Sequence, residues 1–469
     1  MANPEHLRIL LSPAWNDWRK SNPAATPDFV GADLTGADLS GKDLRKAHLS
    51  NAILRGANFA LADLSGALLS GAQIDQAKFK QAKLENLQFD YAELSGIDFP
   101  GANLKGAALR YANLRGSNLS ACNLSNAILD GANLEGANLS VTNLEGAALR
   151  GANLQGVNLF DAKARKTSFE NGQLAGADLM KADLTGAVLN GAKFQKAKFE
   201  GATLSQTSLR SADMTEASFV QAVISDCGFD NSVATRCDFS KAKITNTTFR
   251  NTQLSRVKFV NAELDGCDFS GALLEEVDFR FTSINALQFS RADLRAALFF
   301  KKQFTEFGFD GANLSDADFR ECTMVHCNFQ GARCIKTQFR KSQFKECDLS
   351  FLQAQGSDFG KCHLALCNFS KAVLDRADLR FAVLIGANLK SASLKYADLT
   401  CADLREAHMT GANLWGASLN KARIKGKGIH VLPFKLAGMI LFPIQQMWEK
   451  RKKLQQAQRK ERVEELLRK

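Results

Sequence analysis

The sequence lacks the short motifs that mark the common catalytic sites. It contains no glycine-rich phosphate loop ahead of a helix, no GxSxG, no HExxH and no CxxC pair. Its six histidines are scattered, and no two of them stand at metal-ligand spacing. These absences predict a non-enzymatic chain that needs no cofactor or metal.

A secretory leader is also missing from the start of the sequence. The first residues, MANPEHLRILLSPAW, carry no basic leader, and the apolar run LRILL is too short for a signal peptide. We therefore expect a cytoplasmic protein, with a peripheral membrane location as the alternative that its last residues raise.

Most of the sequence consists of one repeated five-residue motif. Residues 31–40 read GADLTGADLS, and blocks of five keep one register without insertion from Phe29 to Ile424, which is 80 blocks. The block centre is Leu, Phe, Ile or Met in 76 of the 80, and the residue two places earlier is small in nearly all of them. The four undersized centres are Ala164, Ala234, Cys334 and Ala354. Self-similarity of this extent predicts a repeat architecture.

A period of five fits neither a helix nor a flat strand. On an α-helix, leucines spaced by five would scatter around the cylinder and form no apolar stripe. In a flat strand, an odd step would send successive leucines to opposite faces. The chain must therefore bend once per block, so that every centre and every small residue reaches the same interior.

Blocks such as GADLT, GANLE, GANLQ and CDFSK resemble those of the pentapeptide-repeat family of bacteria, over about 400 of the 469 residues. The resemblance implies an all-β solenoid, a right-handed quadrilateral β-helix with four blocks per coil. Eighty blocks would then make about 20 coils, with a length of roughly 95 Å at the spacing of neighbouring strands.

Phenylalanine supports an even number of sides. Between residues 195 and 370 the centres alternate between Phe and smaller side chains, and 25 of the 33 Phe residues stand at centres. On a four-sided coil this alternation stacks Phe on two opposite faces of the core. Glycine often opens a block, where a corner needs conformational freedom, and the Asp or Asn before the centre can bond to nearby backbone. These carboxylates are therefore interpreted as structural.

The register of the eleven cysteines indicates their role. Nine occupy the small inward slot, Cys334 is a centre, and Cys401 alone falls on an outward position. We expect core cysteines in a reducing compartment. Cys327, Cys347 and Cys367 would stack in adjacent coils, but stacked parallel side chains do not converge on one point, so we expect no metal there.

The sequence divides into a helical N-terminal cap at 1–26, the β-helix at 27–426 and a helical C-terminal tail at 427–469. Residues 4–20 are predicted to be helical, with Asn3 as the cap, Pro4 in the first turn and Ser12-Pro13 as a second start signal. The apolar residues of this segment are predicted to cover the first coil, because solenoids need covered ends: Leu7, Leu10, Trp15 and Trp18.

The net charge of +11 is concentrated in the tail. Residues 425–469 hold twelve Lys or Arg against four Glu, whereas residues 29–424 hold 45 against 42 acidic residues. The apolar half, 429–448, is about long enough to span a bilayer, but Lys435, Pro433 and Pro443 argue against that. A helix folded over the last coil is the first interpretation, and a homodimer contact is another. An interfacial anchor is the competing interpretation, with these residues at the membrane surface: Phe434, Phe442, Trp448, Lys450, Arg451, Lys452 and Lys453.

Departures from the repeat locate a candidate partner-binding surface. In residues 297–309, Lys302 and Phe307 stand in slots that elsewhere hold Ala, which predicts a bulge or an outward displacement of Lys302. Near this stretch, basic residues and outward aromatics share two columns: Arg280, Phe281, Phe300, Lys301, Arg320, Arg340, Arg380 and Phe381. They could bind an acidic partner protein or nucleic acid. Neighbouring aspartates, such as Asp278 and Asp318, make paired surface charge the alternative.

Three functional hypotheses follow. The first is a non-enzymatic, rod-like scaffold that binds a protein partner through its solenoid faces, with the tail used for localisation or assembly and nucleic acid bound only through the basic tail. The second is a modulator of DNA gyrase by DNA mimicry, which some members of the resembling family perform. Mimicry requires a strongly acidic surface, and this solenoid is near neutral. The third is a membrane-associated or secreted effector anchored through residues 429–453.

Overall fold

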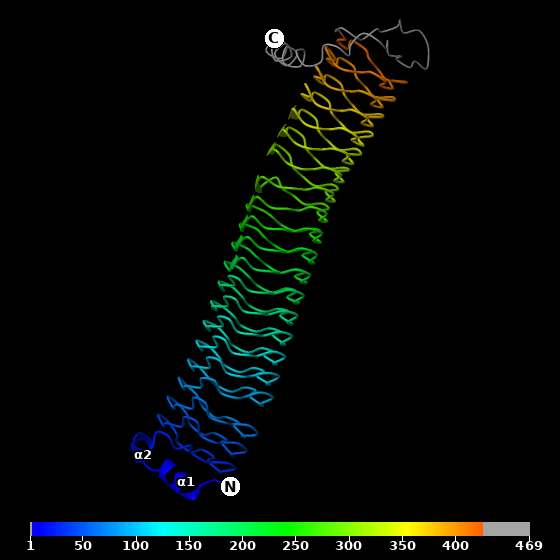
Figure 1. Cartoon of the computed structure of the whole chain (residues 1–469). Coiled ribbons are helices and arrows are strands. Elements are labelled where there is room, and N and C mark those ends of the chain that lie inside the picture. Colours follow the sequence, from blue (N-terminus) through cyan, green and yellow to red (C-terminus); the bar gives the residue numbers. More distant parts are fainter. Residues whose placement is uncertain (1, 425–469) are drawn as a thin grey trace. The chain divides into compact units, whose positions relative to one another are not determined.

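The computed structural model describes residues 2–424. The chain forms two compact units, Met1–Thr247 and Thr248–Lys469, and each is considered by itself. Both units are β-solenoids built of stacked coils (Figure 1), which confirms the predicted fold class. The predicted helical tail lies outside the described residues.

Backbone pairing shows that the coils have four sides. In the first unit, successive parallel bridges join Asp28 to His48, Asp33 to Ile53, Asp38 to Asn58 and Asp43 to Asp63, each spanning 20 residues. The second unit repeats the pattern, for example from Thr248 to Asp268. Four ladders in every 20 residues mean that each block supplies one side of a coil. The number of coils stays a prediction.

The corners explain the block composition. The N–H of Ala32 donates to the carbonyl of Phe29 at 3.0 Å across Gly31, whose φ is +69°. This is a turn that needs a left-handed residue at its third position, which glycine adopts without steric cost. The side chain of Asp33 accepts a hydrogen bond from the N–H of Thr35 at 3.0 Å. The predicted structural roles of Gly and Asp are both confirmed.

Phenylalanine rings fill the core in stacks. In the first unit, Phe219 stacks between Phe199 and Phe239 with centroids 4.6 and 4.8 Å away. In the second unit, Phe319 stacks on Phe299 at 4.6 Å and meets Phe309 edge to face at 5.8 Å. The two columns of rings interlock across the interior, as the alternation predicted, and each ring pair adds to the energy of area burial.

Many polar groups inside the solenoid, although not the hydroxyl of Ser232, are satisfied by backbone carbonyls of the preceding coil. The hydroxyl of Thr142 donates to the carbonyl of Leu119 at 2.8 Å, and the thiol of Cys122 donates to that of Phe99 at 2.9 Å. Such bonds remove most of the cost of burying a hydroxyl. The predicted interior position of the cysteines is confirmed, since ten are buried and only Cys401 is partly exposed.

Among residues 2–424, regular strands occur on one side of the coils only. The first unit holds β1 (Thr203–Ser205), β2 (Val223–Ser225) and β3 (Lys243–Thr245). The second holds β4 (Glu263–Asp265), β5 (Ser283–Asn285), β6 (Gln303–Thr305), β7 (Thr323–Val325) and β8 (Gln343–Lys345). Pairing is parallel in β1–β2–β3, in β4–β5 and in β6–β7–β8. After each strand the inward slot holds Thr, Cys, Leu or Phe rather than Ala.

The solenoid accommodates the stretch at 297–309 without a bulge. Phe307 follows β6, is only 2% exposed and meets Phe304 edge to face at 5.1 Å. The N–H of Lys302 donates to the carbonyl of Phe299 at 3.0 Å, as in an ordinary block. Residues 297–309 therefore keep the register of the repeat.

Two helices cover the first coil of the first unit (Figure 1): α1 (Pro4–Leu10) and α2 (Trp15–Ser21). Asn3 caps α1 as predicted, its side chain accepting from the N–H groups of Glu5 and His6. A second helix does begin shortly after Ser12-Pro13, but Ala14 caps it without a side-chain bond, and the hydroxyl of Ser12 instead donates to the carbonyl of Ile9 at 2.8 Å. Its position at the end of α1 takes Ser12 out of reach of α2.

The buried side of these helices closes the end of the core. Leu10 and Trp15 are fully buried, while Leu7 and Trp18 are half-buried. The indole N–H of Trp15 donates to the carbonyl of Asp43 at 2.8 Å, and its ring lies 5.7 Å from that of Phe29. The four predicted apolar residues thus gather over the first block, and Trp15 fixes the helices to it.

Candidate interaction surface

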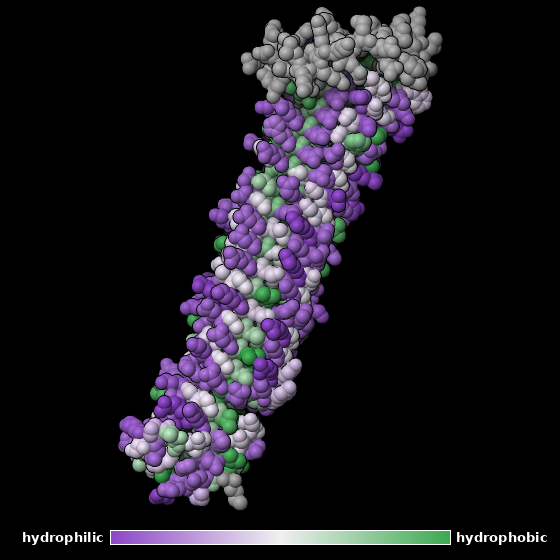
Figure 2. Space-filling model, viewed as in Figure 1, coloured by the Kyte–Doolittle hydropathy of each residue, from purple (hydrophilic) through white to green (hydrophobic). Residues whose placement is uncertain are grey.

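The predicted basic and aromatic residues lie on one outer side of the second unit. We call this surface the arginine face; it comprises Arg280, Phe281, Phe300, Lys301, Arg320, Arg340, Lys341, Lys361, Arg380 and Phe381. Bridges from Asp278 to Leu298 and from Asp318 to Gln338 fix the stacking of the blocks that carry it. Hydrophilic side chains cover most of the visible surface of the protein, and apolar side chains form narrow strips between them (Figure 2).

The arginines of this face are held by aspartates of their own blocks. Arg280 donates from Nε and Nη2 to the two oxygens of Asp278 at 3.0 and 2.8 Å. Arg320 and Arg380 repeat this two-point geometry with the aspartates two residues earlier, their Nη2 atoms standing 2.8 and 2.6 Å from carboxylate oxygens. Two parallel hydrogen bonds fix the plane of each guanidinium. The alternative of paired surface charge therefore describes these arginines.

Arg340 uses a different arrangement. Its Nη1 atom lies 3.6 Å from Asp358 and 4.0 Å from Asp378, so it bridges forward to the following coils. Gly360 makes room for it, since a Cβ at that position would stand 3.1 Å from the Arg340 guanidinium. Lys301 and Lys341 lie on either side of Glu321 at 3.6 and 3.2 Å. Most positive charge on the face is therefore neutralised by neighbours.

Two aromatic residues of the arginine face, Phe281 and Phe381, are exposed. Phe281 is 63% exposed and Phe381 is 54% exposed, whereas phenylalanines at block centres are buried. The guanidinium of Arg280 lies 5.7 Å from the Phe281 ring, and the Lys361 ammonium lies 5.9 Å from the Phe381 ring. Such cation–ring contacts are worth about 0.5–1 kcal/mol at exposed sites. They hold the rings in place without covering them.

Lys302 does not belong to this face. Its ammonium donates to the carbonyl of Thr282 in the preceding coil at 2.5 Å, and burial lowers its pKa. The column it occupies is an interior one, in which Thr282 itself bonds to the carbonyl of Phe259. The sequence predicted an outward displacement of Lys302 because an inward slot would bury its charge, but the long side chain instead reaches a backbone carbonyl from that slot.

The aspartate pairs predict that the stability of the protein falls in acid. The guanidinium of Arg280 is the largest influence on Asp278 and holds its pKa below the ordinary value. For Asp318, burial acts first and raises the pKa, but hydrogen bonds from Arg320 together outweigh it, and the resulting pKa is lowered. A lowered folded-state pKa contributes stability that is present above the unfolded pKa, about 3.9, and is lost as pH falls through the folded value.

We therefore predict that the melting temperature of the full chain falls as pH is lowered below about 4. Asp318→Asn is expected to reduce the stability near neutral pH and to flatten this acid dependence. Asp316→Asn, which removes an exposed carboxylate without an ion pair among residues 2–424, is the matched control. Melting followed by circular dichroism between pH 2 and 7 measures both effects. Equal slopes for all three proteins would contradict the assignment.

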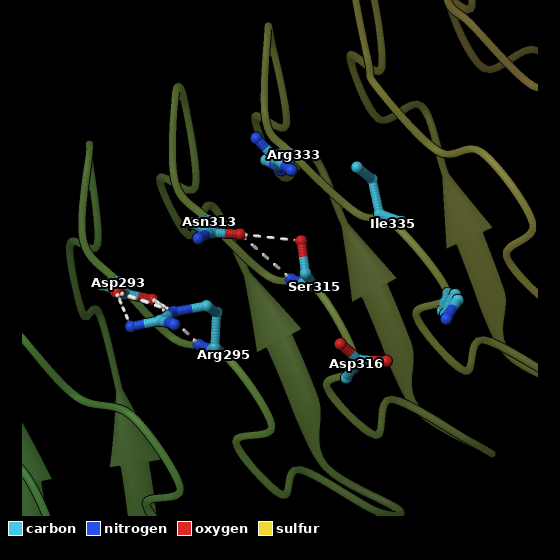
Figure 3. Close-up of a pocket in the computed structure, with 8 residues that line it drawn as sticks. Asp293, Arg295, Asn313, Ser315, Asp316, Arg333 and Ile335 are labelled. Carbon is cyan, nitrogen blue, oxygen red and sulfur yellow. Dashed lines mark hydrogen bonds and ion pairs between the residues drawn. The ribbon is translucent and has the colours of Figure 1, made fainter.

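A surface depression of about 420 Å³ lies on the neighbouring side of the coils and was missed by sequence analysis. In Figure 3, Asn313 and Ser315 bond to each other between the Asp293–Arg295 pair and the side chains of Arg333 and Ile335. Asp316 and Lys336 complete its lining. A sequence signal was present, because Ser315 stands in a column whose adjacent members are Arg295 and Ile335, but only stacking shows that a small residue between larger ones leaves a hollow.

The cysteines considered for a metal site are bonded within the solenoid. Among residues 2–424, no group of three or more His, Cys, Asp or Glu side chains is arranged to hold a metal ion. The thiols of Cys327, Cys347 and Cys367 donate to carbonyls of the preceding coil at 3.5–3.7 Å.

No helix within the described part of the chain is long and apolar enough to cross a membrane. The tail residues Phe434, Phe442, Trp448 and Lys450 to Lys453 lie outside the described residues.

Comparison with known families gives matches over most of the repeat region. A model described as pentapeptide repeats matches residues 28–66, 54–86, 67–106, 82–120, 102–140, 117–156, 158–195, 187–226, 312–350, 324–360, 355–390 and 387–426. A second, described as a pentapeptide repeat region, matches residues 232–306. Together they leave little of the block region unmatched, and no catalytic family is among them. A comparison with curated proteins returns no match.

Solved structures give partial likenesses. HetL of the cyanobacterium Nostoc, described as a pentapeptide repeat protein involved in heterocyst differentiation regulation, is 23% identical, over 56% of this chain and 89% of that chain, with a TM-score of 0.16. QnrB1, a plasmid-mediated fluoroquinolone resistance protein, is 20% identical over 42% and 89%, with a TM-score of 0.22. A pentapeptide repeat protein of the Arabidopsis thaliana thylakoid lumen is 33% identical over 28% and 72%, with a TM-score of 0.13. With TM-scores this low, the family matches carry the assignment.

Proposed function

The chain belongs to the pentapeptide-repeat family, and from this premise we propose that it is a non-enzymatic scaffold that binds a protein partner through the arginine face. The observation that carries the proposal is the exposure of Phe281 and Phe381, at 63% and 54%, beside guanidinium groups with fixed orientation. Phenylalanine and arginine are both enriched in protein interfaces, and arginine is also enriched among the residues that carry most of the binding energy.

The charge arrangement favours a protein over a nucleic acid as the partner. Arg280, Arg320, Arg340 and Arg380 each have an aspartate within 4.0 Å, so a phosphate backbone would have to displace a fixed carboxylate at every contact. Nucleic-acid affinity depends on cations that are free to neutralise phosphates. A protein surface can instead pack on the exposed rings and contact the Arg–Asp pairs, whose charges already neutralise each other. Nucleic acid remains a proposal for the basic tail alone.

The other functional hypotheses receive less support. DNA mimicry needs an acidic surface, and residues 29–424 hold 45 basic residues against 42 acidic ones. Gyrase modulation therefore stays a prediction, which a supercoiling assay tests. Anchoring, localisation and dimerisation through residues 429–453 concern residues outside the described part of the chain, and they stay predictions as well.

The proposal is tested by affinity capture with the full chain and two variants. Phe281→Ala/Phe381→Ala removes the exposed rings and is expected to weaken capture of the specific partner at least tenfold, because truncating an interface centre costs about 2 kcal/mol or more. Phe351→Ala removes another ring that is 44% exposed but does not belong to the arginine face, and it is expected to capture the partner normally. Equal capture by all three proteins would refute the proposed surface.

A further inference from the structure

The depression on the side next to the arginine face contains an arginine with an unusual environment. Of the 22 arginines among residues 2–424, 18 make an ion pair with a carboxylate. Arg333 is not one of them, although it lines a depression that also contains Asp293 and Asp316. The exposed guanidinium of Arg333 therefore keeps its full donor capacity at the edge of a hollow.

One acidic group that lines the depression is already engaged. Asp293 is bound by Arg295, with Nη2 to Oδ2 at 2.9 Å, and the same guanidinium reaches Glu275 at 3.3 Å. The Asp293 carboxylate is thus neutralised by an arginine of its own block, as on the arginine face. Lys336, which also lines the depression, makes no ion pair within the described residues. Two cations at this site lack a partner.

The floor of the depression supplies a further donor. The hydroxyl of Ser315 donates to Oδ1 of Asn313 at 2.8 Å, and the N–H of Ser315 reaches the same oxygen at 3.3 Å. These two bonds fix the orientation of the carboxamide, because its oxygen is fully used. The amide nitrogen of Asn313 then has no acceptor among residues 2–424, and it lies between the coil of Arg295 and the coil of Arg333 (Figure 3).

These groups define the ligand by chemistry. A guanidinium, an ammonium and an amide N–H around one hollow match a single oxyanion, since a guanidinium binds carboxylate or phosphate oxygens in pairs. Ile335 adds an apolar wall that suits the short hydrocarbon stem of a side chain. Asp316, exposed on the rim, opposes a polyanion such as nucleic acid, whose further charges would meet it.

We infer that this depression is a recognition site for one oxyanion, the side-chain carboxylate or phosphate of a protein partner, held by Arg333 with help from Lys336 and Asn313. The inference rests on the proposed function only in that a protein carries the oxyanion. The site and the arginine face occupy adjacent sides of the same coils in the second unit, so one partner segment that turns the corner between them can use both.

The test is peptide binding to the full chain, followed by fluorescence anisotropy. Three labelled peptides of otherwise identical neutral sequence carry a single phosphoserine, a single glutamate or a single glutamine, with both ends blocked. Binding of the phosphoserine peptide, the glutamate peptide or both above the level of the glutamine peptide supports the inference and identifies which oxyanion is recognised. Equal affinity for all three peptides, or no binding of any of them, overturns it.

Variants locate the site. Arg333→Ala is expected to weaken oxyanion-peptide binding about tenfold or more, because a hydrogen bond to a charged group is worth about 1.5–3 kcal/mol. Arg333→Lys keeps the charge but loses the paired hydrogen-bond geometry. Its affinity for the oxyanion peptides is expected to lie between those of the unmodified chain and Arg333→Ala. Arg291→Ala is the matched control, since Arg291 is exposed, makes no ion pair among residues 2–424 and does not line the depression. Equal losses for Arg333→Ala and Arg291→Ala would reduce the effect to net charge and overturn the assignment.

The experiment separates this inference from the proposed function. Phe281→Ala/Phe381→Ala should bind the oxyanion peptides like the unmodified chain, because neither ring lines the depression. Loss of partner capture with intact peptide binding supports both proposals. Normal partner capture by the double phenylalanine variant together with Arg333-dependent peptide binding refutes the arginine face and leaves the oxyanion site standing.

Discussion

Replacing Phe319 with alanine is expected to lower the free energy of unfolding of the surrounding coils by about 3–5 kcal/mol. Phe319 is fully buried and stacks between Phe299 at 4.6 Å and Phe339 at 5.4 Å. It also meets Phe309 edge to face from the other ring column. Removing it leaves a cavity that both columns line. The coils cannot close this cavity, because their spacing is set by backbone hydrogen bonds.

Chemical denaturation combined with hydrogen exchange measures this effect. In a solenoid each coil contacts its neighbours, so exchange should accelerate most in residues 299–339 and less with distance along the stack. Phe351→Ala is the matched control, because that ring is 44% exposed and contacts the ammonium of Lys371 at 4.9 Å. Its loss is expected to cost less than about 1 kcal/mol. Equal costs for the two substitutions would contradict the ring-stack core.

Trp15→Ala is expected to detach the N-terminal helices and to destabilise the first coil by about 3–5 kcal/mol. Trp15 is fully buried, stacks with Trp18 at 5.0 Å and donates its indole N–H to the carbonyl of Asp43. Without Trp15, the Phe29 ring and the backbone edge of the first coil become exposed to solvent. Uncovered β edges favour pairing between molecules, so concentration-dependent association should accompany the loss of stability.

Light scattering and exchange of the amides between residues 29 and 48 measure the two consequences. Trp15→Phe retains a ring but removes the hydrogen bond to Asp43 and part of the buried ring volume, so it should cost less than Trp15→Ala and cause little association. Trp415→Ala removes an indole that is 45% exposed and should leave the first coil unchanged. A monomeric Trp15→Ala variant with unaltered exchange would show that α1 and α2 do not protect the end of the solenoid.

The outcome for individual residues shows where sequence-based prediction stops. The interior positions of Ala32 and Leu34 and the corner position of Gly31 follow from the five-residue period alone, because each residue belongs to a slot that repeats along the block region. The same holds for the thiols, which take the place of alanine in the interior. The side-chain partners of Lys302 and Ser12 were not predicted, because the Lys302 ammonium bonds to the carbonyl of Thr282 in the preceding coil and the Ser12 hydroxyl bonds to the carbonyl of Ile9 in the helix before it.

The sequence by itself determined the architecture of this protein. A period of five with one large apolar and one small residue per block has a single way to bury both, which is a chain that turns at every block and stacks upon itself. Only the tertiary structure decided what the surface offers. Stacking brings residues 20 apart side by side, and long charged side chains then select among several partners. Arg280 pairs with Asp278, and the ammonium of Lys302 bonds to the carbonyl of Thr282. Arg333, which lines the surface depression, makes no ion pair within the described residues.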